Sequence, residues 1–121
     1  ARKTRDSYSV DAVAERCAIA ALRDQEHAQA GCAAVREERQ RLAARLQGLG
    51  LPSVPSEANF LLCQVPSDFA GGAATVYRKL REQGIFVRYF DQPGLRDRLR
   101  ITVGRAEHND TLLRALRRLR P

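Results

Sequence analysis

Residues 99–104 read Leu-Arg-Ile-Thr-Val-Gly, and this stretch decides the fold. Its apolar side chains recur at every second position, which is the period of a β-strand with one buried face. Gly104 ends the run, and leucines at helical spacing continue from about residue 106 to residue 119. We therefore predict a strand followed by a final helix, with Arg100 on the strand face opposite the apolar side chains.

The preceding segment predicts a second strand. Residues 85–90 read Ile-Phe-Val-Arg-Tyr-Phe, and β-branched and aromatic residues are typical of strands. Asp-Gln-Pro-Gly follows at residues 91–94 and predicts a turn. Because so short a connection joins strands that run in opposite directions, we expect the two strands to be antiparallel. Arg88 then lies on the face opposite its apolar neighbours.

Residues 59–65, Asn-Phe-Leu-Leu-Cys-Gln-Val, predict a further, central strand. A helix from about residue 73 to residue 83 separates it from the strand at 85–90, and such a crossover places two strands parallel. Earlier in the chain, Ser9 is a candidate N-cap for a first helix. The resulting class is α+β, with two layers: a mixed sheet of about three strands and helices on one side.

A long helix is predicted from about residue 26 to residue 49. Its apolar stripe is interrupted by Arg39, and Glu37 and Arg41 on another face are spaced to form an ion pair. The order of elements is therefore helix, helix, strand, helix, strand, strand, helix.

The chain has 121 residues and a formal net charge of +7. That length fits one compact domain and is short for a complete cofactor-dependent enzyme. Its polar first residues predict a linker-like segment at 1–8 that leads into the domain. No long apolar run predicts a membrane span, and no signal peptide is visible.

The basic residues are dispersed, and nearly all are arginine. The densest cluster, at residues 114–120, is interpreted as the solvated last turn of a helix. Nucleic-acid binding is therefore the least favoured hypothesis, although Phe86, Tyr89 and Phe90 on one predicted strand could stack on bases.

The cysteines, Cys17, Cys32 and Cys63, are odd in number and widely spaced. They are interpreted as small buried thiols of a protein in the reducing cytoplasm. His27 and His108 are isolated from each other and from the cysteines, so no metal site is predicted.

Arg88 and Arg100 are the candidate functional residues. If their strands are neighbours, both guanidinium groups emerge on one face, where each can hold a carboxylate or phosphate through two hydrogen bonds. The alternative is a pair of ordinary surface charges. Lys79 is interpreted as a solvated helix residue, and Gly71 with Gly72 as the start of a helix rather than a phosphate loop.

Three stretches together resemble one family: Pro-Ser-Glu-Ala-Asn-Phe-Leu-Leu at 55–62, Gly-Ile-Phe-Val-Arg at 84–88, and residues 99–104. They resemble the C-terminal small domain of histidinol-phosphate aminotransferases, which are fold-type I pyridoxal-phosphate enzymes of class I/II. Threonine-phosphate decarboxylases are similar. The segment at 6–11 also resembles the family, except that Ser9 stands where the family usually has Asn.

The resemblance implies specific roles. Arg100 would bind the substrate α-carboxylate or its equivalent, and Arg88 would bind the substrate phosphate or the distal carboxylate of glutamate. Asn59 would lie near the mouth of the active site behind the substrate-binding residues; a strand-start side chain that bonds to backbone is the simpler alternative. No catalytic residue is expected in this chain.

The resemblance also implies what else the parent enzyme contains. A large domain would supply the lysine that binds pyridoxal phosphate, and the parent would be a homodimeric, cytoplasmic enzyme of histidine biosynthesis. This chain would contribute substrate binding and domain closure, and alone it would bind no cofactor and be inactive. The alternative hypothesis is a free-standing α+β module for ligand binding or regulation, which would bury its own apolar surface; a separated domain would leave an apolar patch exposed.

Overall fold

The structure is a computed structural model, and it describes residues 10–120. Both the segment 1–8 and Ser9 lie outside the described residues. The chain divides into two units, Ala1–Ala33 and Ala34–Pro121, and each is described by itself. The helices are α1 (Ala12–Arg23), α2 (Gln25–Gly48), α3 (Ala73–Glu82) and α4 (Ala106–Leu119), and the strands are β1 (Phe60–Gln64), β2 (Arg88–Tyr89) and β3 (Arg98–Thr102).

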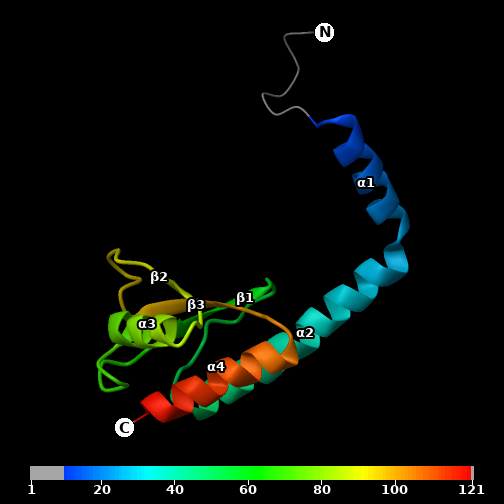
Figure 1. Cartoon of the computed structure of the whole chain (residues 1–121). Coiled ribbons are helices and arrows are strands. Elements are labelled where there is room, and N and C mark those ends of the chain that lie inside the picture. The colour runs from blue at the N-terminus through cyan, green and yellow to red at the C-terminus, as the bar shows by residue number, and fades with distance from the viewer. Residues whose placement is uncertain (1–9, 121) are drawn as a thin grey trace. The chain divides into compact units, whose positions relative to one another are not determined.

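The sheet has the order β1-β3-β2, and both neighbouring pairs are antiparallel (Figure 1). The α+β class is therefore confirmed, and the expectation of a mixed sheet is wrong. β1 and β2 do run in the same direction, as a helical crossover requires, but β3 lies between them. The strand with the clearest alternation thus occupies the centre, where both of its edges are hydrogen-bonded.

The second strand is much shorter than predicted. Gly84 adopts a left-handed conformation, with φ of 73°, just after the end of α3. The backbone N–H of Ile85 then donates to the carbonyl of Leu80, at 2.9 Å. Because residue 85 is hydrogen-bonded back to the helix, the chain joins the sheet only at Arg88.

Each strand buries one face. Leu61 and Cys63 of β1 and Leu99 and Ile101 of β3 are all at most 2% exposed, and they pack in one core with the helices. The helical share of this core comes from α2 (Leu42, Leu46), α3 (Ala73, Val76, Leu80) and α4 (Leu112, Leu113, Ala115, Leu116). The helices of the unit Ala34–Pro121 therefore cover one face of the sheet and leave the other face open.

The first helix differs from this pattern. It begins after Asp11, whose side chain accepts a hydrogen bond from the N–H of Ala14 at 2.8 Å, as an N-cap does. It buries none of its residues, and Val13 and Leu22 are both at least 70% exposed. α1 is thus an apolar helix without a core of its own.

Two expectations about the first half of the chain are wrong. Cys17 and Cys32 are exposed, and only Cys63 is buried. Burial raises the pKa of the Cys63 thiol to about 12. Arg41 does not form the expected pair with Glu37, but pairs with Glu38 of α2 and Asp110 of α4. The second ion pair links α2 to α4.

Candidate functional site: the open face of the sheet

Arg88 and Arg100 stand side by side on adjacent strands. They are direct partners in the antiparallel register of β2 and β3. Their neighbours along the strands, Tyr89 and Leu99, point to the helix layer, because side chains alternate between faces. Tyr89 stacks there on Tyr77 of α3, with ring centroids 5.9 Å apart. Both arginines therefore emerge on the open face, as predicted from the alternation of the sequence.

Two phenylalanines surround these arginines. The guanidinium carbon of Arg100 lies 5.3 Å from the ring centroid of Phe60 and 5.9 Å from that of Phe90. The guanidinium carbon of Arg88 lies 5.5 Å from the same Phe90 ring. We call these four residues the arginine–phenylalanine cluster. All three distances fall within the range in which a cation is attracted to the face of an aromatic ring.

The cluster contains no acidic group. Among residues 10–120, neither Arg88 nor Arg100 forms an ion pair or a side-chain hydrogen bond. Both side chains are exposed. Two positive charges with free N–H donors on one face form a site whose chemistry suits an anion.

Phe60 and Phe90 were not identified from the sequence as partners of the arginines, although their positions along the strands place them near Arg88 and Arg100. Phe90 follows Arg88 by two residues, so the two share a face of the strand. Phe60 pairs with Thr102, two residues from Arg100 on the adjacent strand, and such diagonal neighbours are within reach of aromatic side chains. The missing information was that β3, and not β2, pairs with β1.

Asn59 lies next to this site at the start of β1. Its side chain is exposed, and its backbone carbonyl accepts a hydrogen bond from the N–H of Val103 at 2.8 Å. This contact extends the pairing of β1 with β3 by one residue beyond Phe60 and Thr102. The backbone of Asn59 thus helps to hold β3 in place, whichever role its side chain has.

A polar network fixes the far end of β3. The side chain of Asn109, which is 3% exposed, donates to the carbonyl of Gly104 at 2.9 Å and accepts from its N–H at 3.1 Å. It also donates to Glu38 at 2.8 Å. The hydrogen bond from Arg41 is the main cause that lowers the pKa of Glu38. Asn109 was not identified from the sequence, although it lies three residues before Leu112 and four before Leu113 and so shares the apolar face of α4.

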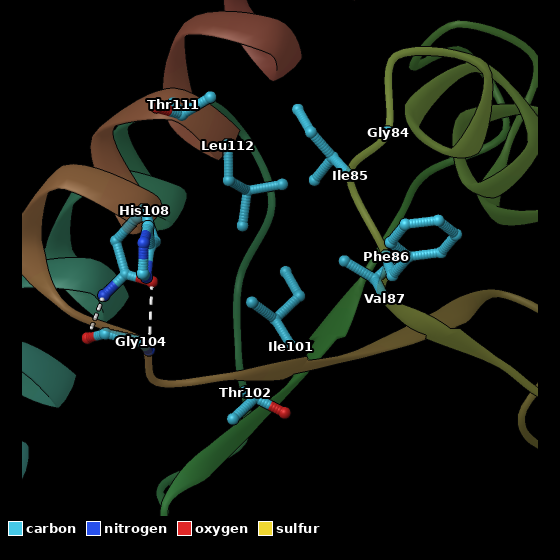
Figure 2. Close-up of a pocket in the computed structure, with 11 residues that line it drawn as sticks. Gly84, Ile85, Phe86, Val87, Ile101, Thr102, Gly104, His108, Thr111 and Leu112 are labelled. Carbon is cyan, nitrogen blue, oxygen red and sulfur yellow. Dashed lines mark hydrogen bonds between the residues drawn. The ribbon is translucent and has the colours of Figure 1, made fainter.

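A separate pocket of about 300 Å³ lies between the segment 84–87, the end of β3 and the first turns of α4. Ile85, Ile101 and Leu112 point toward one another in it, from three different segments (Figure 2). His108 is the one ionisable side chain in its lining. Since neither arginine lines this pocket, it is not the anion site.

Metal-ligating side chains and Lys79 are the other groups of the described chain that could carry chemistry. No group of three or more metal-ligating side chains occurs among residues 10–120. Lys79 belongs to α3, whose Tyr77 packs on the sheet face opposite Arg88. Lys79 and the two arginines therefore do not form one site. No helix in this part of the chain is both long and apolar enough to cross a membrane.

Known proteins similar to this chain are aminotransferases and a decarboxylase. The class I and II aminotransferases match residues 1–117. Histidinol-phosphate aminotransferase 1 of Nostoc sp. is 51% identical over 117 residues, which are 97% of this chain and 32% of that protein. The histidinol-phosphate aminotransferase of Sinorhizobium meliloti, solved in complex with pyridoxal-5'-phosphate, has a TM-score of 0.84 and 28% identity over 98% of this chain and 32% of its own. A decarboxylase from Sulfurospirillum multivorans has a TM-score of 0.81 and 25% identity, and the match covers 94% of this chain and 33% of that chain.

The chain belongs to the class I and II aminotransferase family. Curated relatives that are 40–51% identical to it are histidinol-phosphate aminotransferases. It spans about a third of the length of those relatives, and its fold matches that of their small domain.

Proposed function

We propose that this chain is the small domain of a pyridoxal-phosphate-dependent histidinol-phosphate aminotransferase, where it binds the anionic groups of the substrate. The observation that carries the proposal is the pair of arginines on the open sheet face, with no acidic partner in the described chain. Arg100 binds the substrate carboxylate, and Arg88 binds the phosphate or the distal carboxylate of glutamate. Each does so through the paired N–H groups of a planar guanidinium.

The remaining part of the protein would hold the cofactor and supply the catalytic lysine. Within that enzyme, this domain orients the substrate and closes over it, which excludes water from the reaction. The exposed apolar residues of α1 support a larger assembly, because a helix that is apolar and unburied needs a partner surface. The parent is a cytoplasmic homodimer of histidine biosynthesis in this proposal, and Asn59 lies near the mouth of its active site.

The proposal is tested by turnover. The full-length protein should transfer the amino group of histidinol phosphate to 2-oxoglutarate. Arg100→Ala should lower kcat/KM for glutamate, whose α-carboxylate Arg100 binds, by about 30- to 1000-fold, which corresponds to a loss of about 2–4 kcal/mol of transition-state binding. Arg96→Ala is the matched control, because Arg96 is an exposed arginine of the same segment that pairs with Asp91. Near-normal turnover in Arg100→Ala would remove Arg100 from the site.

A second candidate, a free-standing ligand-binding module, is favoured by the completeness of the core in Ala34–Pro121. The described part of the chain leaves no buried side-chain polar atom without a hydrogen bond. The two functions differ in the apolar surface that they expect: a separated domain leaves an apolar patch exposed, whereas a free-standing module buries its own. Stoichiometric covalent attachment of pyridoxal phosphate to these 121 residues alone would contradict the proposed division between domains.

A further inference from the structure

We propose that Phe90 is a positioning residue that holds Arg88 and Arg100 together as one ordered anion receptor, with Phe60 supporting Arg100 from the other side. This inference rests on the proposed function above and deepens it, because it says how the two arginines are kept ready for the substrate. The phenylalanine rings have no hydrogen-bond donor for an anion, so their role is to position the arginines that bind it.

The two arginines need such support. They are direct cross-strand partners, and like charges opposite each other in a sheet repel. Arginine also has many rotamers, so an exposed guanidinium must lose considerable side-chain entropy when it binds a ligand. Nothing acidic in the described chain offsets either effect.

The aromatic rings are placed to offset both. One ring, that of Phe90, lies within 5.5 Å of the Arg88 guanidinium and 5.9 Å of the Arg100 guanidinium. The face of an aromatic ring carries partial negative charge, so a ring shared by two cations attracts both. Phe60 lies 5.3 Å from Arg100, so Arg100 has rings from two different segments, β1 and the residue after β2.

An aromatic partner has an advantage over an acidic one. A carboxylate would occupy the N–H donors of the guanidinium, as Glu38 and Asp110 do with Arg41. A ring attracts the cation without accepting those hydrogen bonds. The donors therefore stay available for the two-point contact with a carboxylate or phosphate. This geometry orders the receptor and leaves its binding groups unused.

The test compares Phe90→Leu, which keeps the apolar bulk and loses the ring, with Phe90→Tyr, which keeps the ring. In the full-length enzyme, Phe90→Leu should raise KM for histidinol phosphate by about three- to tenfold, with kcat within about twofold of wild type. Inhibition by inorganic phosphate, competing with the substrate, should weaken by a similar factor. Phe90→Tyr should restore both values to within about twofold. Phe86→Leu is the matched control, since Phe86 is 80% exposed, lies four residues earlier and is not the ring in any of the cation–π contacts of the two arginines.

Three outcomes would overturn the inference, and the first two are distinct from failure of the proposed function. An unchanged KM in Phe90→Leu, together with the expected loss in Arg100→Ala, contradicts the role of Phe90 and leaves the anion site standing. A parallel fall of kcat and of the melting temperature in Phe90→Leu, not restored by Phe90→Tyr, indicates a purely structural residue. Normal turnover in Arg100→Ala removes the site and this inference with it.

Discussion

Arg39 and Arg41 on α2 differ from Arg88 and Arg100 on the sheet in what satisfies their guanidinium groups. Arg39 is 7% exposed and donates to the carbonyl of Ala58 at 3.0 Å and to Glu57 at 2.8 Å. Arg41 donates to two carboxylates, whose hydrogen bonds raise its pKa. Within residues 10–120, the sheet arginines lie close to aromatic rings and form no ion pair.

This difference separates two uses of the same residue. An arginine whose donors are already filled holds parts of the chain together, and its loss weakens the fold. An arginine whose donors are free is available to a ligand, and its loss weakens binding. All these arginines carry the same charge. What distinguishes Arg88 and Arg100 is that their guanidinium groups lie beside aromatic rings rather than carboxylates.

The largest effect on stability is expected at Arg39. Arg39→Ala should lower the free energy of unfolding by about 1–3 kcal/mol, because the carbonyl of Ala58 loses its buried donor. KM for the substrate should not change. Urea denaturation and steady-state kinetics measure the two effects, and Arg39→Met, which keeps the aliphatic stem, separates lost packing from lost hydrogen bonds. Wild-type stability in Arg39→Ala would contradict the idea that arginines with filled hydrogen-bond donors stabilise the fold.

A smaller, pH-dependent effect is expected at Glu38. Its pKa is lowered chiefly by the hydrogen bond from Arg41, so its ionised form stabilises the fold. That contribution is complete above the unfolded pKa, about 4.3, and is lost as the pH falls through the lower folded pKa. Glu38→Gln should reduce stability at neutral pH by about 1 kcal/mol and flatten the acid side of the stability profile. Parallel acid profiles of the two proteins would refute this role.

A weaker effect is expected at Glu57, although it forms an ion pair with Arg39. Its side chain is 95% exposed, so water screens the pair. Glu57→Ala should lower the free energy of unfolding by less than about 0.5 kcal/mol. Urea denaturation beside Arg39→Ala tests this, and equal losses in the two variants would mean that the ion pair, and not the bond to Ala58, is what stabilises Arg39.

The smallest effect on stability is expected at Arg88. Arg88→Ala removes the attraction to Phe90 and also removes the repulsion from Arg100, so the free energy of unfolding should change by less than about 0.3 kcal/mol. Phosphate inhibition should nevertheless weaken. A large loss of stability measured by thermal denaturation would place Arg88 with the structural arginines.

Much of this fold was predictable because alternation is a local property. The strand pattern around residues 99–104 correctly placed Arg100 opposite the core, and the same argument held for Arg88. The order of the strands in the sheet was not predictable in the same way, because it depends on tertiary contacts that decide which strands pair. The strand predicted from residue 85 failed for a related reason: Ile85 hydrogen-bonds back to α3.

The aromatic partners of the arginines were only partly predictable. Phe90 shares a strand face with Arg88, which the sequence shows directly. Phe60 comes close to Arg100 only through the pairing of β1 with β3, whose sequences are some 40 residues apart. The roles of Asn109 and Arg39 were missed for another reason. The helical period places both on apolar faces, but it does not say that Gly104 and Ala58 would be their hydrogen-bond partners.

The direct pairing of Arg88 with Arg100 also has a consequence for how this segment can evolve. The loop between β2 and β3 can gain or lose residues while Arg88 and Arg100 stay on the open face of the sheet. The face on which a side chain lies depends on its position within its own strand, not on the length of the loop. Deleting one residue inside β3 would instead turn Leu99 or Ile101 outward and drive a charge into the core. Natural length variation among related sequences should therefore be concentrated in residues 91–97 and be absent from the strands on either side.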